Sequence, residues 1–163
     1  MAITGISQPD SITIDPTLRL RKINGDYHIA LPWYQDAEIV WLVDGDDELY
    51  TEELLQKMYT WWSNQGEVYW IEILQNGTFT PIGDVSFNQK DLPIVIGNKA
   101  YWNQGIGTKV IQTMIQRAQQ LGYPSIEVDE IYDWNTGSQQ LYTKLGFQPY
   151  EKTEKGTRYR LIF

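Results

Sequence analysis

The sequence predicts an α/β fold in which a mixed sheet carries helices on both faces. Two strand-like apolar runs are each followed by a loop and by a segment whose apolar residues have helical spacing. Hairpin signals stand before and after this pair of units. Strands that alternate with helices in this way are typical of layered α/β domains, because each helix buries its apolar side against the sheet.

The first part of the chain contains two strand signals and two helical ones. A strand-like run stands at 11–14, and alternation of apolar and polar residues predicts the first core strand at 18–23. Residues 26–41 are interpreted as an irregular helical stretch that Pro32 breaks. A helix is expected at 51–62, with its first residue, a threonine, as the capping residue.

Two hairpins frame the remaining elements. Asn76-Gly77 is a strong turn signal and predicts paired strands at 67–74 and 78–87. A final hairpin is expected to pair 147–152 with 158–163.

Composition narrows the functional class. The 163 residues suit one domain, 1–163, and contain no Cys and a single His, His28. A Cys nucleophile, a disulfide and a Cys-ligated or His-rich metal site are therefore excluded, so we expect no metal. His28 is interpreted as a surface or packing residue, and the absence of Cys fits a cytoplasmic location.

Charge and hydropathy limit the partners. The net charge of −8 disfavours nucleic acid, because no basic stripe is present to neutralise phosphates. It favours a cationic substrate, although acidity that only maintains solubility explains it equally well. No apolar run reaches the roughly 18 residues of a membrane span, and no secretory signal pattern is present. A homodimer is compatible with the sequence.

The most informative stretch is a loop with two glycines, Tyr101-Trp102-Asn103-Gln104-Gly105-Ile106-Gly107-Thr108-Lys109. It follows the apolar run 92–97 and precedes helical spacing at 106–121. Backbone N–H groups at such a helix start, together with the positive end of the helix dipole, favour a phosphate-type anion. Gly105 and Gly107 have no Cβ and are expected to let a ligand approach the backbone closely.

A second informative segment, 126–147, predicts a short strand, a loop, a helix and a helix end, in that order. It ends in Asn135-Thr136-Gly137-Ser138-Gln139-Gln140-Leu141-Tyr142-Thr143-Lys144-Leu145-Gly146-Phe147. Asn135 suits the residue before the helix, and Gly146 suits the residue just after it.

Together these two segments resemble the GNAT superfamily of N-acetyltransferases. The family's cofactor motif has the form R/Q-x-x-G-x-G/A, and Trp102 stands here where Arg or Gln is usual. The later family motif, N-x-x-A/S-x-x-L-Y-x-K-x-G-F, matches from Asn135 to Phe147. The resemblance covers 94–147, and the first loop is similar to those of aminoglycoside 6′-N-acetyltransferases and ribosomal-protein N-acetyltransferases.

The resemblance implies the acyl-CoA N-acyltransferase fold and an enzyme that uses acetyl-CoA as cosubstrate. Direct transfer is expected, because no Cys is present to carry an acetyl group. The expected cofactor-binding residues are Val95, Ile96, Gly97, Asn103, Gln104, Gly105, Ile106, Gly107, Thr108 and Asn135.

The chemistry needs a proton acceptor, because an amine is protonated at neutral pH. Glu130 is the first candidate for this base, since several family members carry an acidic base at the matching position. Glu72 and Asp84 are rivals, because each interrupts an apolar strand, and each could instead bind the substrate amine.

The leaving thiolate benefits from a proton donor, and the resemblance implies Tyr142 for that role. Trp33 is a candidate for the substrate-binding wall, where an aromatic face attracts an amine by cation–π interaction.

The leading hypothesis is therefore transfer of an acetyl group from acetyl-CoA to a primary amine. The acceptor stays open among aminoglycosides, polyamines, protein N-termini and small amine metabolites. Two alternatives are a CoA-binding sensor or interaction module on the same fold and a purely structural domain.

Overall fold

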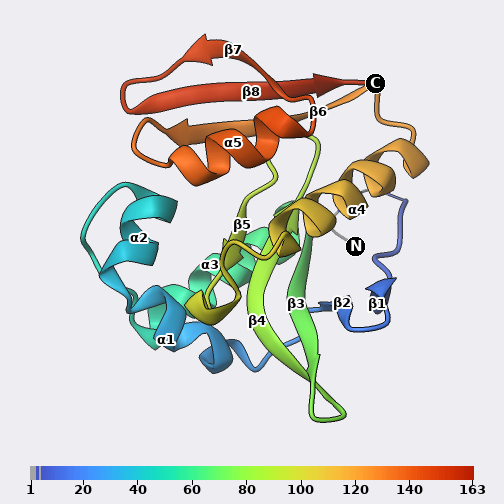
Figure 1. The fold of residues 1–163 in the computed structure, drawn as a ribbon, viewed down its shortest axis with the longest axis vertical. Helices are drawn as coiled ribbons and strands as arrows, with labels where there is room; N and C mark the ends of the chain where they lie inside the picture. Colours follow the sequence, from blue (N-terminus) through green and yellow to red (C-terminus); the bar gives the residue numbers. More distant parts are fainter. Residues whose placement is uncertain (1–2, 4) are drawn as a thin grey trace.

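Two antiparallel sheets form the framework of the protein in this computed structural model, which describes residues 3 and 5–163 (Figure 1). The larger sheet has strand order β1-β2-β3-β4-β5 and the smaller has order β6-β8-β7. The α/β class with helices on both faces is confirmed. The division into two sheets was not predicted, because it depends on contacts between distant segments.

The strands follow the predicted order with small changes of boundary. Their bounds are β1 Ser11–Asp15, β2 Leu18–Lys22, β3 Glu67–Gln75, β4 Thr78–Phe87, β5 Ile94–Ile96, β6 Ser125–Tyr132, β7 Gln148–Lys152 and β8 Gly156–Ile162. The β3–β4 turn has positive φ at Asn76 and Gly77, 50° and 80°. Both predicted hairpins are therefore confirmed, and the first has the turn that Asn-Gly favours.

The predicted helices are present, the stretch around Pro32 is irregular as expected, and the short η2 Lys99–Tyr101 was not predicted. The others are the short η1 Tyr27–Ala30, and α1 Leu31–Tyr34, α2 Ala37–Asp44, α3 Glu52–Gln65, α4 Ile106–Gln120 and α5 Thr136–Lys144. Pro32 stands in the first turn of α1, where its missing N–H costs no bond. Pro32 therefore stands beside a helix boundary, where η1 ends at Ala30 and α1 begins at Leu31, and a second break precedes Asp36, which caps α2.

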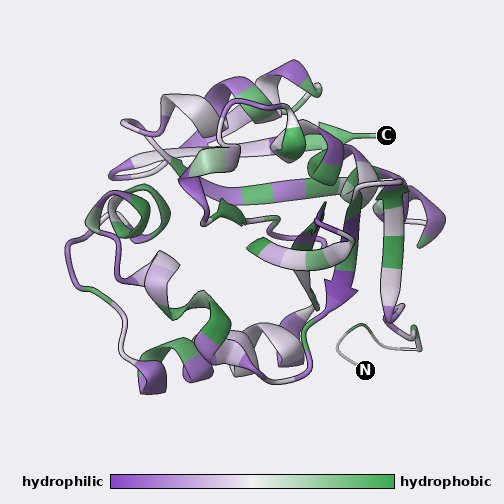
Figure 2. Cartoon of the chain, turned by 60° about the horizontal axis from the view of Figure 1, so that its bottom comes forward, coloured by the Kyte–Doolittle hydropathy of each residue, from purple (hydrophilic) through white to green (hydrophobic). Residues whose placement is uncertain are grey.

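Alternation along β3 sends side chains into two separate cores. Tyr69 and Ile71 face the core covered by α4 and α5, which we call the α4-side core. Val68 and Trp70 face the core covered by α1, α2 and α3, the α3-side core. Successive residues of a strand point to opposite faces, so one strand serves both cores. Figure 2 shows how apolar and polar residues are distributed in bands along the elements.

The two sheets part between β5 and β6. Just before β5, the Glu127 N–H of β6 donates to the Gln89 carbonyl at 3.0 Å, and the Asp129 N–H donates to the Asp91 side chain at 3.0 Å. Beyond this point β5 pairs only with β4, and β6 only with β8. Within the described residues, no helix has the length and apolarity to cross a membrane.

Candidate functional site

A cavity of about 570 Å³ lies where the sheets part, lined by α2, β5, β6 and the starts of α4 and α5. It gathers most of the residues that the sequence singled out, namely Val95, Ile96, Asn103, Gln104, Gly105, Ile106, Gly107, Glu130, Asn135 and Tyr142. Five predicted residues are not among those that line it: Gly97, Thr108, Trp33, Glu72 and Asp84.

The start of α4 presents backbone donors to this cavity. The first bond of the helix is from the Lys109 N–H to the Gly105 carbonyl at 3.2 Å. The N–H groups of Ile106 and Gly107 therefore precede any intrahelical bond. Gly105 caps the helix with a φ of 79° and no side-chain cap, so the positive end of the dipole stays open to a ligand.

The two glycines of the loop have different surroundings. A Cβ built on Gly105 would have no heavy atom within 4 Å, so the space beside this residue is open. A Cβ on Gly107 would stand 3.3 Å from a methyl carbon of Leu141. Gly107 thus permits the close approach of α4 to α5, a packing role that the sequence analysis did not foresee.

The free edge of β5 supplies further backbone groups. Hydrogen bonds from the Ser86 N–H to Pro93 and from the Gly97 N–H to Ile82 set the pairing with β4. Because polar groups alternate along a strand, those of Ile94 and Ile96 are directed away from β4. Ile94, Val95 and Ile96 all line the cavity, but only Ile94 and Ile96 turn backbone polar groups away from β4.

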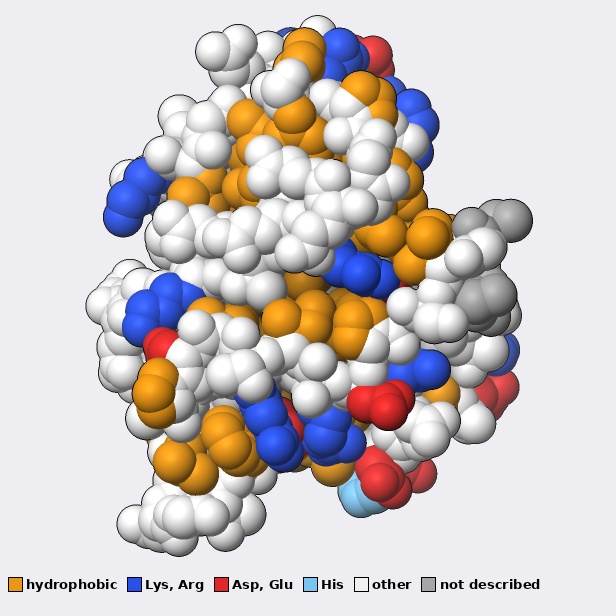
Figure 3. All heavy atoms as spheres, turned by 90° about the vertical axis from the view of Figure 1, so that its right-hand side faces the viewer, with side chains coloured by type: hydrophobic (Ala, Val, Ile, Leu, Met, Phe, Trp, Pro, Cys, Tyr) orange, Lys and Arg blue, Asp and Glu red, His pale blue; other side chains and the backbone are white. Residues whose placement is uncertain are grey.

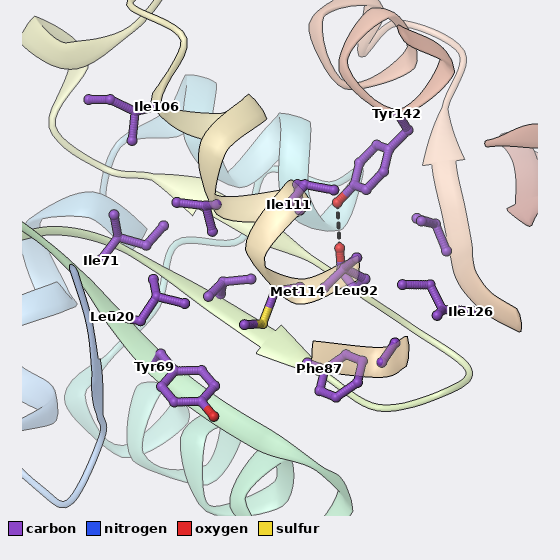
Figure 4. Close-up of a cluster of buried hydrophobic side chains, with 14 of the residues drawn as sticks. Leu20, Tyr69, Ile71, Phe87, Leu92, Ile106, Ile111, Met114, Ile126 and Tyr142 are labelled. Carbon is purple, nitrogen blue, oxygen red and sulfur yellow. Dashed lines mark hydrogen bonds between the residues drawn. The ribbon is translucent and has the colours of Figure 1, made fainter. Parts of the chain in front are cut away.

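Tyr142 closes the inner end of the cavity. Its side chain is 2 % exposed and lies in the α4-side core. Figure 4 shows its hydroxyl, which donates to the carbonyl of Leu92 across the gap between α5 and the segment before β5. Burial raises the pKa of Tyr142, so the hydroxyl keeps its proton.

Glu130 lies on the opposite wall, on β6. The pairing of β6 with β8 shifts register between Val128 and Ile131, so one extra residue is accommodated beside Glu130. Such bulges re-aim side chains. The Thr153 hydroxyl donates to Glu130 Oε2, and the carboxyl is partly accessible along the cavity wall.

Asn135 and its neighbours hold α2 over the cavity. Asn135 Oδ1 accepts from the Ser138 N–H at 3.1 Å and so caps α5. Three side chains of this loop donate to carbonyls near the end of α2: Tyr132 to Asp44 at 2.9 Å, Trp134 to Trp41 at 3.0 Å and Asn135 to Leu42 at 3.2 Å. Sequence reasoning missed this attachment, because nothing local links 41–44 to 132–135.

Trp33 and Gly97 pack against each other outside the cavity. A Cβ on Gly97 would stand 2.1 Å from the Trp33 ring, so only glycine leaves room for that ring. Trp33 is 9 % exposed and meets Trp70 edge-on. The structure therefore places both in the α3-side core.

Glu72 forms ion pairs with two arginines and does not line the cavity. Its oxygens accept from Arg19 Nε and Arg21 Nε, each at 2.8 Å, and its side chain is 2 % exposed. Of the two readings for a carboxylate in an apolar strand, the ion pair is the one the structure shows.

Asp84 is buried among tyrosines of the α3-side core. Tyr34 and Tyr59 donate to its Oδ2 at 2.8 and 2.6 Å. Burial raises the pKa of Asp84 to about 6, while the two hydroxyl donors oppose that rise.

Basic side chains are absent from the described residues that line the cavity, and its carboxylates are Asp91, Asp129 and Glu130. The nearest lysines along the loop are engaged, Lys109 with Asp15 at 2.8 Å and Lys99 with Asp36 at 2.8 Å. On the face in Figure 3, Lys and Arg are spread among neutral and acidic residues. No group suited to hold a metal ion occurs among residues 3 and 5–163.

Trp102, which departs from the family motif, is occupied within the protein. Its indole N–H donates to the Ile96 carbonyl at 2.7 Å, and Lys99 Nζ lies 5.5 Å from its ring. It therefore ties the loop to β5, and the donors left for an anion are backbone groups.

Comparison with known proteins agrees with this geometry. The model of the Acetyltransferase (GNAT) family matches residues 27–147. A domain from Methanocaldococcus jannaschii is 22 % identical with a TM-score of 0.78, over 91 % of this chain and 100 % of that one.

Two further solved structures share the fold. The AAC(6')-Ib structure with ribostamycin and coenzyme A is 16 % identical with a TM-score of 0.73, over 90 % of this chain and 93 % of that one. The ribosomal L7/L12 alpha-N-protein acetyltransferase RimL is 16 % identical with a TM-score of 0.69, over 94 % of each chain.

Proposed function

The chain belongs to the Acetyltransferase (GNAT) family, and we propose that it transfers the acetyl group of acetyl-CoA to a primary amine. The acceptor is a small cationic molecule or a protein N-terminus. The observation that carries the proposal is the cavity between the sheets, which combines open backbone donors, a buried tyrosine hydroxyl and a carboxylate.

The cofactor fits this cavity through backbone groups. The N–H groups at the start of α4 suit a pyrophosphate, because they combine unsatisfied donors with the helix dipole. The open space beside Gly105 leaves room for it. The outward polar groups of Ile94 and the outward N–H of Ile96 suit the amides of an extended pantetheine arm, as an added strand would, while the Ile96 carbonyl is occupied by Trp102.

Two side chains would then serve as proton acceptor and proton donor in the reaction. Acetyl-CoA supplies a thioester, whose carbonyl is open to attack by an amine. Glu130 accepts the proton that the amine must lose. Tyr142 turns its hydroxyl from the Leu92 carbonyl to the departing sulfur and donates its proton there. The N–H of Ile94 or Ile96, which is directed away from β4, would stabilise negative charge on the carbonyl oxygen.

The charge of the cavity supports a cationic acceptor. Its titratable lining is acidic, through Asp91, Asp129 and Glu130, and acidic clefts concentrate cations. One structure of similar fold holds ribostamycin, and another is an alpha-N-protein acetyltransferase. Both classes of amine are therefore part of the proposal.

The experiment is a thiol-release assay with acetyl-CoA and a panel of aminoglycosides, polyamines, N-terminal peptides and small amines. The control for each active amine is its N-acetylated form, which offers no free amine at the reacting position. Release of one thiol for each amide formed is the expected result.

Calorimetry of acetyl-CoA binding accompanies the assay and separates the alternatives. Binding without turnover for any amine would favour a CoA-binding sensor on the same fold. Absence of both binding and turnover would overturn the assignment of the cavity.

A further inference from the structure

The side chain of Asp91 forms the vertex of the cavity, the point where the two sheets begin to separate. Along β6, the Glu127 N–H finds a backbone acceptor in Gln89, at 3.0 Å. Two residues later the Asp129 N–H points to the same edge and finds Asp91 Oδ1, at 3.0 Å. A carboxylate thus takes the place of the next main-chain carbonyl, and beyond it the strands separate.

Asp91 is fixed in this place by its own turn. Asn88 Oδ1 accepts from the Lys90 and Asp91 N–H groups at 2.8 and 2.9 Å. The Asn88 N–H in turn donates to the Asp91 carbonyl at 3.1 Å. The main chain at Asp91 is therefore held from both sides, and its carboxylate does not depend on the cavity for its position.

The same carboxylate also orients the residue that holds Tyr142. Asp91 Oδ1 accepts from the Leu92 N–H at 2.9 Å. The Leu92 carbonyl accepts the Tyr142 hydroxyl. Leu92 is fully buried, and both Asp91 and Tyr142 line the cavity. One oxygen atom therefore links β6, the peptide of Leu92 and, through that peptide, the hydroxyl on α5.

We propose that Asp91 is a positioning residue, which sets the vertex of the cavity and, through Leu92, the place of the Tyr142 hydroxyl. It acts as an acceptor of two N–H groups and not as a base. This inference rests on the proposed function, because the hydroxyl it positions is the proposed proton donor.

The test compares Asp91→Ala with Asp91→Asn, using the amine identified by the thiol-release assay. Asn keeps an oxygen that accepts both N–H groups, and Ala keeps none. In Asp91→Ala we expect kcat to fall by about 100-fold, the scale of a misplacement near 1 Å, with little change in the affinity for acetyl-CoA. Asp91→Asn should recover turnover, since acceptance and not charge is at issue.

Amide hydrogen exchange supplies the readout that needs no acceptor amine. Exchange at Leu92 and Asp129 should accelerate in Asp91→Ala, while Glu127, bonded to a backbone carbonyl, should keep its rate. Unchanged exchange at Leu92 and Asp129 overturns the inference whether or not any amine is acetylated.

The kinetic arm has its own decisive outcomes. Turnover of Asp91→Asn as low as that of Asp91→Ala contradicts positioning by acceptance, and so does wild-type kcat in Asp91→Ala. Failure of the proposed function itself shows differently, as a wild-type protein that acetylates no amine.

Discussion

The two cores of this protein differ in their residue composition. The α4-side core is largely aliphatic, contributed by residues such as Leu20, Ile71, Val110 and Met114. The α3-side core is rich in Trp and Tyr and encloses the carboxyl of Asp84, which two tyrosines bond.

The two cores also differ in how far local sequence patterns predict them. Aliphatic residues at helical spacing place α4, and with it a row of backbone donors that need no particular side chain. On the other side, aromatic residues pack by stacked and edge contacts between elements distant in sequence, as in Tyr27 with Tyr59 and Trp33 with Trp70. Local sequence patterns therefore predict the start of α4, where the cofactor is proposed to bind. The packing of the α3-side core is known only from the three-dimensional structure.

Tyr142→Phe should give the largest effect, on turnover, because it removes the proton donor at the inner end of the cavity. A fall in kcat of about 10²–10⁴-fold is expected for loss of a general acid, with acetyl-CoA affinity retained because the ring still packs. Steady-state kinetics and calorimetry measure the two. Wild-type turnover would return Tyr142 to a packing role only.

Glu130→Gln should reduce kcat by about 100-fold or more, because Gln keeps the shape and cannot accept the amine's proton. Glu72→Gln is the matched comparison. It breaks two ion pairs among residues that do not line the cavity, so it should lower stability and leave kcat per folded molecule unchanged. The reverse pattern would make Glu72 the base.

Asp84→Asn tests the buried carboxyl of the α3-side core. Burial raises its folded pKa to about 6, above the ordinary aspartate value of 3.8, so the folded state binds more protons between those values. Stability from this group is therefore greatest below about pH 4 and declines as pH rises through 6, by at most about 3 kcal/mol.

Urea unfolding of wild type and Asp84→Asn from pH 4 to 7 measures this effect. Burial also raises the pKa of Asp91 to about 6, and subtraction of the two curves removes this contribution because both proteins share it. The wild type should lose stability relative to the variant as pH rises. Parallel curves would show that Asp84 does not change its proton affinity on folding.

Local sequence patterns predicted much of the fold and the start of α4, where the cofactor is proposed to bind. Asn76-Gly77 predicted its hairpin, and Asn135 and Gly146 predicted the ends of a helix, because caps and turns depend on a few adjacent residues. Glu72 could have been assigned more firmly. Arg19 and Arg21 alternate on a neighbouring strand and so share one face, which is a signal for its ion pairs.

The rest could not be predicted, for reasons that the structure makes plain. Asp91 reads as a polar turn residue, and its bond to Asp129 joins positions 38 residues apart. The proposed positioning role of Asp91 depends on that bond. The attachment of α2 joins residues about 90 positions apart.

Backbone donors at the start of α4 are proposed to bind acetyl-CoA, and Gly105→Val tests that binding most directly. Gly122→Val is the matched control, because both glycines have φ near 80° and open space around a built Cβ, but only Gly105 lines the cavity. Both variants should lose a similar 1–2 kcal/mol, roughly the cost of a left-handed residue with a side chain. Calorimetry should then show acetyl-CoA binding lost in Gly105→Val and retained in Gly122→Val, whereas equal affinity in both folded variants would contradict the account.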